Sequence, residues 1–234
     1  MSTDFPQLPP RPGDGHKGTF GTVCIVGGQS AVPRVMIGGP AFSAIGALRS
    51  GAGLAVLALP EPVMNTGLEI APSATGLALP VDGDGALIPS ETARLLDEHE
   101  ASWDCIAVGP GLGADVPQQQ IVMRLVGGED IPLVIDADAL NALASVPEFD
   151  GDFRAPAILT PHPGEYQRLA KSLDLDADPI DPEQRGPAAE LLASRLGCVV
   201  VLKGAGTIVS DGVNTWTNPT GGVALATAGT GDAL

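Results

Sequence analysis

The stretch PLVIDADALNALA, residues 132–144, contains the pattern that decides the fold. Its first half is a short, nearly continuous apolar run, which is typical of a strand buried on both faces of a parallel sheet. Two aspartates interrupt the run, and residues 139–144 then have the apolar spacing of a helix. We therefore expect a strand that passes into a helix at residues 136–138.

The same order of strand and helix recurs along the chain. We expect further strands where short apolar runs precede Gly, Pro or Asp, at 22–28, 54–60, 105–111, 157–164 and 199–204. Helical patterns occur at 41–49, 90–98, 118–126, 165–170 and 183–196. This alternation predicts an α/β fold, a three-layer α/β/α sandwich around a mostly parallel sheet. The segment TIVSDGVNTWTN adds a predicted hairpin that turns at Asp211 and Gly212.

Composition limits the classes of protein that fit. The chain has 234 residues, 44% of them apolar and 17% charged, which excludes a disordered chain or a coiled coil. No stretch approaches the roughly 18–20 apolar residues of a membrane span. Residues 1–15 form a Pro-rich lead-in without the apolar region of a signal peptide. We expect one domain, residues 16–234, in a soluble cytoplasmic protein.

The net charge of −16 disfavours nucleic acid and anionic membranes as partners. It does not exclude an anionic ligand, because backbone N–H groups and a few cations can hold one locally. Ligands of open parallel sheets bind at the carboxyl ends of the strands. The residues that follow each apolar run are therefore the candidates for a site.

The motif AGTGD, residues 228–232, is the most informative of these strand-end segments. Gly229 and Gly231 let successive backbone N–H groups converge on one point, which makes an anion site where a helix begins. Asp232 then stands where a carboxylate could take the proton of a hydroxyl next to a transferring phosphoryl group. A plain glycine turn with an Asp near a helix start is the alternative.

The motif LKGAGT, residues 202–207, follows a predicted buried strand. Lys203 would emerge at the end of this strand, Gly204 and Gly206 would allow close approach of a ligand, and Thr207 offers a hydroxyl. A phosphate or adenosine contact is one reading, and a tight turn with an exposed lysine is the other. The P-loop and the Gly-x-Gly-x-x-Gly fingerprint are both missing from the sequence.

Three further segments carry polar groups or glycines at strand ends. In TPHPGE, His162 lies between two prolines and could contact a substrate, while Glu165 either orients a metal-bound water or complements the helix dipole. In DADALN, one of Asp136 and Asp138 is expected to cap the following helix. The glycines of GPGLG, residues 109–113, force a loop against which a ligand could lie.

Taken in order, these motifs resemble the ADP/ATP-dependent NAD(P)H-hydrate dehydratases, a branch of the ribokinase-like superfamily. The resemblance extends over nearly the whole chain from His16 onward. The matching stretches are HKGTFGTVCIVGG (16–28), ALRSGAGLAVLALP (47–60), VGPGLG (108–113), VIDADALNAL (134–143), ILTPHPGEYQRLA (158–170), VVVLKGAGT (199–207) and ATAGTGD (226–232).

The resemblance implies a carbon–oxygen lyase that repairs hydrated NADH and NADPH, with ADP or ATP as co-substrate and Mg²⁺ as cofactor. The hydrate hydroxyl is phosphorylated and the phosphate is then eliminated. Asp232 would be the base, and the N–H groups around Gly229, Thr230 and Gly231 would stabilise the phosphoryl charge. The positions that match the family's adenine-nucleotide site are Lys203, Gly204, Ala205, Gly206, Thr207 and Gly231. Those that match its substrate site are Gly39, Gly111, Gly113, His162 and Asp232.

The sequence departs from the family pattern in two places. Gly39, in a loop at 30–40, stands where the family has Ala. The family also continues for some tens of residues after the GTGD motif, whereas this chain ends at Leu234. From this we expect the C-terminal helices to be missing and the activity to be impaired, because two residues cannot form a stable helix.

The resemblance further implies a homo-oligomer, commonly a tetramer. The family often carries a hydrate-epimerase domain ahead of this one, and because residues 1–15 alone precede His16, we expect a separate protein to supply the epimerase. Related small-molecule kinases have Asn at the position of His162, and His favours the dehydratase branch. A ribokinase-like kinase for a thiamin precursor is the alternative enzyme. An inactive nucleotide-binding remnant is the alternative that is not an enzyme.

Overall fold

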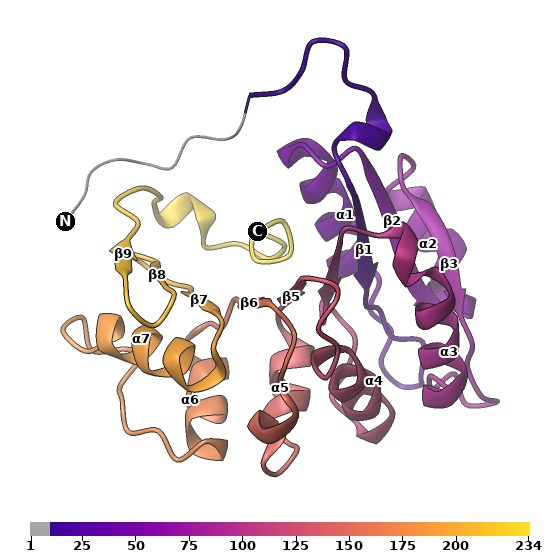
Figure 1. Ribbon diagram of the computed structural model, residues 1–234. Helices are drawn as coiled ribbons and strands as arrows, with labels where there is room; N and C mark the ends of the chain where they lie inside the picture. Colours follow the sequence, from indigo (N-terminus) through magenta and orange to yellow (C-terminus); the bar gives the residue numbers. More distant parts are fainter. Residues whose placement is uncertain (1–9) are drawn as a thin grey trace.

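The computed structural model describes residues 10–234, and the strands of this part form a single nine-stranded sheet (Figure 1). The strands are β1 (Thr22–Val26), β2 (Leu54–Pro60), β3 (Thr75–Leu79), β4 (Cys105–Val108), β5 (Leu133–Ile135), β6 (Ala157–Leu159), β7 (Val199–Leu202), β8 (Ile208–Ser210) and β9 (Thr215–Thr217). Their order is β3-β2-β1-β4-β5-β6-β7-β8-β9. Neighbours pair in parallel from β3 to β7, and the last two pairings are antiparallel. The predicted mostly parallel sheet is therefore confirmed.

Helices flank both faces of this sheet. They are α1 (Gly38–Ser50), α2 (Met64–Ile70), α3 (Pro89–His99), α4 (Val116–Val126), α5 (Asp138–Ala144), α6 (Pro163–Ser172) and α7 (Arg185–Leu196). Short 3₁₀ turns lie at Lys17–Thr19, Glu61–Val63, Glu100–Ser102, Phe149–Asp152 and Val223–Leu225. Helices α1 and α2 pack on β1, β2 and β3, and α3 to α7 form the layer on the other face. None of the helices in residues 10–234 is both long enough and apolar enough to cross a membrane.

Every strand predicted from an apolar run is present; β2 has the predicted bounds, and the other strands end earlier than predicted. For example, β1 ends at Val26 because Gly27 and Gly28 already belong to the loop that follows. The hairpin is also confirmed, and Asp211 Oδ1 closes its turn by accepting from the N–H groups of Val213 and Asn214. Helix α2 and strand β3 were not predicted.

Strand β3 escaped prediction because of its composition and its place in the sheet. Its sequence TGLAL has one β-branched residue and contains a glycine. It is an edge strand, and most of its residues are at least partly exposed. An edge strand needs less apolar surface, so the pattern that identifies central strands is weak there. The lead-in predicted at 1–15 falls mostly outside the described residues, and 10–15 contain no helix or strand.

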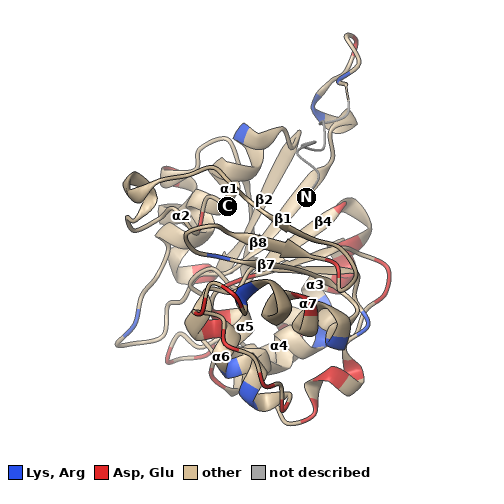
Figure 2. Cartoon of the chain, turned by 90° about the vertical axis from the view of Figure 1, so that its left-hand side faces the viewer, with Lys and Arg blue, Asp and Glu red and all other residues tan. Residues whose placement is uncertain are grey.

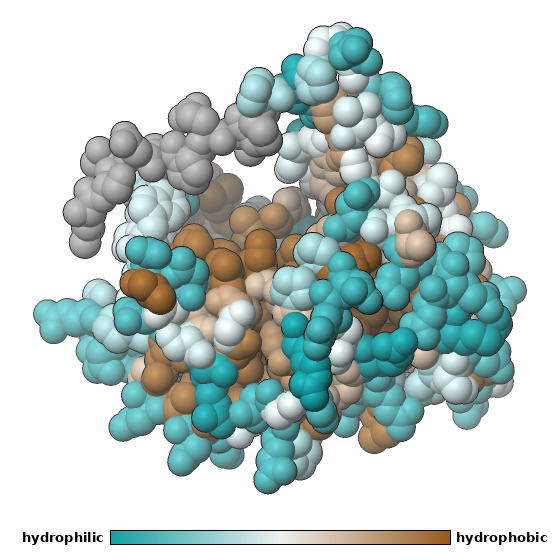
Figure 3. Space-filling view, in the orientation of Figure 1, coloured by the Kyte–Doolittle hydropathy of each residue, from teal (hydrophilic) through white to brown (hydrophobic). Residues whose placement is uncertain are grey.

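The two halves of the sheet differ in how far the side chains of their strands are buried. In β1, Cys24 and Ile25 are both fully buried although they point to opposite faces. In β6, Leu159 is 0% exposed, but its neighbour Ile158 is 39% exposed. The prediction that strands are buried on both faces is thus confirmed for β1 and wrong for β6. Among residues 10–234, helices α1 and α2 cover this face only over the β1–β3 half. In Figure 3 apolar side chains gather over the middle of the molecule.

Candidate functional site

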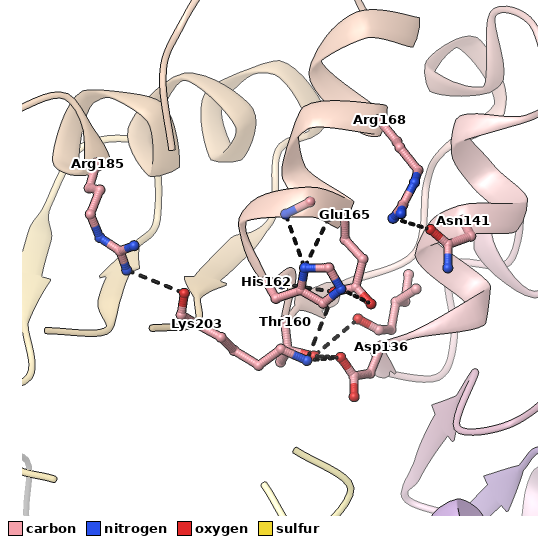
Figure 4. A network of polar contacts seen from close by, with 10 residues as sticks. Asp136, Asn141, Thr160, His162, Glu165, Arg168, Arg185 and Lys203 are labelled. Atoms are coloured by element: carbon pink, nitrogen blue, oxygen red, sulfur yellow. Dashed lines mark hydrogen bonds and ion pairs between the residues drawn. The ribbon is translucent and has the colours of Figure 1, made fainter. Parts of the chain in front are cut away.

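A lysine and a carboxylate meet where the central strands end. Lys203 directly follows β7 and Asp136 directly follows β5, and Lys203 Nζ lies 2.5 Å from Asp136 Oδ1 (Figure 4). Thr160, at the end of the intervening β6, donates its hydroxyl hydrogen to the same Asp136 oxygen at 2.7 Å. The three residues are adjacent because parallel neighbouring strands bring their carboxyl ends to one edge. Lys203 is therefore a partly buried, paired cation.

The two aspartates of DADALN do not have the role predicted for one of them. The N-cap of α5 is Ala137, and neither aspartate caps the helix. Asp136 instead faces Lys203, and Asp138 Oδ2 accepts from the backbone N–H of Gly113 at 2.9 Å. The N-cap expectation is wrong because the N–H of Asp136 still donates to Val108 O of the neighbouring strand and its carboxylate pairs with Lys203, so that Ala137, at φ 49°, turns the chain into α5.

His162 is the N-cap of α6. Its Nδ1 accepts from the N–H groups of Gly164 at 3.0 Å and Glu165 at 3.3 Å, and Glu165 Oε2 accepts from His162 N at 2.8 Å. This reciprocal arrangement is a capping box. Because Nδ1 accepts, the proton of the neutral ring is on Nε2, which lies 3.3 Å from Glu165 Oε1. Burial, and then the positive charges of Lys203 and Arg168, lower the pKa of His162.

Glu165 is a buried carboxyl group, only 5% exposed. Burial raises its pKa to about 7, although the N–H of His162 and the charge of Lys203, 4.0 Å away, favour ionisation. Both of its oxygens face His162. Glu165 therefore takes part in the capping box at the start of α6. Its contact with a metal-bound water stays a prediction.

The predicted base Asp232 lies against the start of α1. Ser43 Oγ donates to the backbone oxygen of Asp232 at 2.7 Å. A Cβ atom added at Gly39 would lie 3.2 Å from Asp232 Oδ1 and 3.3 Å from the side chain of Pro110. Further along the helix, a Cβ at Gly46 would come within 2.8 Å of the Ala233 carbonyl oxygen. Small residues on this face of α1 thus let the AGTGD segment and the GPGLG loop approach one another.

The backbone of the AGTGD segment is only partly hydrogen-bonded. Gly229 has φ 87°, and the Ala233 N–H closes a single turn onto Gly229 O at 3.2 Å. Within residues 10–234, the N–H groups of Gly231 and Asp232 have no hydrogen-bond acceptor. Lys203 Nζ lies 3.9 Å from where a Cβ at Gly231 would be. A carboxylate, a cation and free N–H groups therefore meet here, the combination expected of a phosphoryl site.

The pKa of Asp232 is raised. Burial is the main cause, the negative charge of Asp136 adds to it, and Lys203 opposes it. A carboxyl group with a raised pKa is a better proton acceptor when it is ionised. The environment of Asp232 thus suits the role of a general base.

The GPGLG loop requires its glycines. Gly111 has φ 63°, and a Cβ there would lie 2.7 Å from the side chain of Met36. Gly113 has φ 85°, and its N–H is held by Asp138. These two positions therefore combine a left-handed backbone, which favours glycine, with close approach of neighbouring groups.

The predicted nucleotide positions after Lys203 form an exposed turn. Gly204, Ala205 and Gly206 are exposed, and Thr207 Oγ1 donates to Gly204 O at 3.0 Å. Of residues 203–207, Lys203 is the one whose charge acts on Asp232, and its Nζ lies 3.9 Å from where a Cβ at Gly231 would be.

Arg185, which the sequence reasoning missed, supports this strand end. Its Nη2 donates to the carbonyl oxygens of Leu202 at 3.1 Å and Lys203 at 3.3 Å. Nothing in the sequence pattern singles out Arg185, because it begins α7 after an Asp-rich loop and has no motif around it.

The profile of the NAD(P)H-hydrate dehydratase family matches residues 23–234. The chain therefore belongs to the NAD(P)H-hydrate dehydratase family.

Individual relatives agree with this family assignment. The ADP-dependent (S)-NAD(P)H-hydrate dehydratase of Bacillus subtilis is 36% identical over 231 residues, which cover 97% of this chain and 74% of the relative. The bifunctional NAD(P)H-hydrate repair enzyme of Moorella thermoacetica is 39% identical over 230 residues. This chain spans 42% of the length of that relative, while 97% of the chain is covered.

The fold of the family is shared as well. A crystal structure of the Bacillus subtilis ADP/ATP-dependent NAD(P)H-hydrate dehydratase, co-crystallized with ATP and Mg²⁺, superposes with a TM-score of 0.72 at 32% identity. The match covers 97% of this chain and 73% of that one. The predicted ribokinase-like α/β architecture is confirmed.

Proposed function

We propose that this member of the NAD(P)H-hydrate dehydratase family restores hydrated NADH and NADPH in a reaction driven by ADP or ATP. The observation that carries the proposal is the meeting of Asp232, Lys203 and the unpaired N–H groups of Gly231 and Asp232 at one sheet edge. Relatives that align with nearly the whole chain are named for this activity.

Asp232 acts as the general base. The hydrate hydroxyl attacks the terminal phosphoryl group of the nucleotide, Asp232 takes the hydroxyl proton, and the bond to the remaining nucleotide breaks. The N–H groups around Gly231 and the Lys203 ammonium stabilise the charge that develops on the phosphoryl oxygens. The phosphate then leaves the ring carbon, helped by the ring nitrogen, and loss of a proton from the adjacent ring carbon restores the double bond of the reduced nicotinamide. Asp232 stands beside Gly39, which suits the placement of the hydroxyl there.

The adenine nucleotide is held by the strand end and turn that follow β7. Lys203 supplies the charge, while the exposed backbone of Gly204, Ala205 and Gly206 leaves room for the ligand, with Thr207 at the end of the turn. Arg185 holds this strand end in place by donating hydrogen bonds to the carbonyl oxygens of Leu202 and Lys203. The substrate side consists of Gly39, Gly111, Gly113, His162 and Asp232.

The residues present fit Mg²⁺ only together with a nucleotide. Residues 10–234 contain no group of three or more His, Cys, Asp or Glu side chains that could hold a metal ion. Mg²⁺ in nucleotide enzymes usually has one or two carboxylate ligands and takes the rest from phosphates and water. Asp136, Glu165 and Asp232 are the carboxylates near Lys203. Asp136 already pairs with the lysine, so Asp232 and Glu165 are the candidates to hold Mg²⁺, with Glu165 acting through water. When bound, Mg²⁺ would neutralise charge on the phosphates.

Recovery of absorbance at the reduced-nicotinamide band tests the proposal directly. Hydrated NADH or NADPH is incubated with the chain, ADP or ATP and Mg²⁺. We expect recovery with the parent chain and a loss of about 100-fold to 10,000-fold in kcat for Asp232→Asn, the range typical of a lost general base. The exposed Asp84→Asn is the matched control and should retain full activity.

The same assay separates the alternatives. Phosphorylation of a hydroxymethyl-pyrimidine or a thiazole without recovery of NADH would favour the thiamin-precursor kinase. Nucleotide binding in calorimetry without either reaction would identify an inactive remnant. Full activity of Asp232→Asn would contradict the assignment of the base.

Assembly and location are also part of the proposal. We expect a homo-oligomer, commonly a tetramer in this family, and a cytoplasmic location. Light scattering coupled to size-exclusion chromatography checks the assembly.

A further inference from the structure

A hollow of about 940 Å³ lies beside the GPGLG loop. Its walls come from the loop at 29–36, from α5 and from the last turns of α6. The volume is within the range of small-molecule sites, which extends to about 1,000 Å³. Asp232, Lys203 and Gly231, which form the proposed phosphoryl site, do not line this hollow.

The hollow and Asp232 border the same loop. Met36 and Gly113 line the hollow, and the backbone of Gly111 lies against the Met36 side chain. The next residue back along the loop, Pro110, lies against Gly39, which in turn contacts Asp232. A long ligand could therefore extend from Asp232 across the glycine loop into the hollow.

Three cations line the hollow in a chain that is otherwise strongly acidic. They are Arg34, Arg168 and Lys171, and within residues 10–234 none of them forms an ion pair. The net charge of the whole chain is −16. In Figure 2 many of the charged residues lie on the layer of helices α3 to α7, and the whole chain has 28 acidic residues against 12 Lys and Arg residues. Unpaired cations around one hollow attract an anion, because their potentials add.

The rest of the lining suits a nucleoside. Arg168 Nη1 donates to Asn141 Oδ1 at 2.9 Å, which holds the guanidinium at the wall (Figure 4). Val35 and Met36 are 60% and 51% exposed, so they offer apolar surface to a planar base. Asp138 uses only Oδ2 for Gly113, which leaves its other oxygen for a ribose hydroxyl.

We propose that this hollow binds the phosphorylated adenosine half of the dinucleotide substrate, with Arg34, Arg168 and Lys171 contacting its phosphate oxygens. The inference rests on the proposed function, in which the hydrated nicotinamide lies beside Asp232. It extends that function by assigning the far end of the substrate to a second set of residues.

Equilibrium binding of unhydrated probes tests the inference without turnover. The probes are NADPH, NADH, reduced nicotinamide mononucleotide and ADP with Mg²⁺. The variants are Arg34→Gln and the double variant Arg168→Gln with Lys171→Gln. Arg49→Gln is the matched control, because Arg49 also forms no ion pair within residues 10–234, lies in the last turn of α1 and does not line the hollow.

We expect the double variant to bind NADPH about tenfold to hundredfold more weakly than the parent chain, since each lost charged contact is worth about tenfold. Binding of the mononucleotide, which lacks the adenosine half, should not change. Loss for NADPH alone assigns the cations to the 2′-phosphate, and equal loss for NADH, with none for the mononucleotide, assigns them to the 5′-phosphate of the adenosine half.

Other outcomes would overturn the inference. They are no binding of NADPH by the parent chain, an unchanged affinity in the variants, an equal loss for the mononucleotide, or a loss for ADP in place of the dinucleotide. A failure of the proposed function would be recognised by a different outcome. Missing turnover together with the expected binding pattern would argue against dehydration and leave the adenosine site standing.

Discussion

At the residue scale, the site depends on charges that the fold brings close together. Asp136 pairs with Lys203 and also raises the pKa of Asp232, while Lys203 lowers it. The lysine is therefore shared between the Asp136 carboxylate and the proposed phosphoryl site. Its motif was recognisable in the sequence, but its partner was not, because the two residues are 67 positions apart.

Glu165 should make stability depend on pH. Its pKa is raised from 4.5 to about 7 by burial, so the folded state holds the proton more tightly than the unfolded state. The contribution of Glu165 to the free energy of unfolding therefore decreases as pH rises from about 4.5 to about 7. Above about pH 7 this contribution does not decrease further. We expect Glu165→Gln to remove this contribution, since a neutral amide can still accept from His162 N.

Urea unfolding of the parent and of Glu165→Gln at pH 5 and pH 8, with EDTA present, measures this effect. The stability of the variant relative to the parent should be higher at pH 8 than at pH 5. A difference that is the same at both pH values would show that Glu165 ionises normally in the folded chain.

At the element scale, α1 positions the AGTGD segment through its small residues. Gly39, Ser43 and Gly46 form the face of the helix that meets Asp232 and Ala233. The segment makes a single turn of its own, so its position depends on this helix. The hydrophobic pattern of α1 predicted the helix, but it did not indicate which small residues accept a partner.

The variant Gly46→Ala separates stability from activity. Alanine favours a helix interior by about 1 kcal/mol over glycine, which acts against any loss of stability. Its Cβ would press on the Ala233 carbonyl oxygen at 2.8 Å and displace the neighbouring Asp232. We expect dehydration to fall severalfold while the melting temperature, followed by circular dichroism, stays the same or rises.

Gly186→Ala in α7 is the control for this variant. A Cβ at Gly186 would have its nearest neighbour, the Thr215 side chain, at an ordinary 3.9 Å. This substitution should leave activity unchanged. Equal activity of both variants would mean that α1 does not hold the base in place.

At the scale of the whole molecule, the two faces of the sheet differ in what covers them. Helices α3 to α7 pack along one face, where Leu133, Leu159 and Val200 are buried. On the other face, helices of residues 10–234 cover β1 to β3, and Ile158 of β6 is partly exposed. The contribution of an apolar residue to the free energy of unfolding therefore depends on the face of the sheet to which it points.

Two neighbouring residues of β6 test this difference. We expect Leu159→Ala to reduce the free energy of unfolding by about 2–5 kcal/mol, because it leaves a cavity in the core. Ile158→Ala should cost about 1 kcal/mol, since much of this side chain already faces solvent. Urea denaturation measures both values, and similar losses for the two variants would contradict the asymmetry.

The sequence by itself determined the repeating strand–helix order, the hairpin after β7 and the candidate motifs at the strand ends. These features are local, because they depend on side-chain periodicity and on the turn preferences of Gly, Pro and Asp. The motifs Lys203, His162 and Asp232 were therefore found without coordinates.

Only the tertiary structure decided how these motifs combine. It paired Lys203 with Asp136, made His162 the cap of α6, and brought Arg34 to the same hollow as Arg168. It also left Ile158 partly exposed where the apolar run predicted burial on both faces. The physical reason is that such contacts join residues far apart in the chain, and neither periodicity nor propensity carries information about which distant elements pack together.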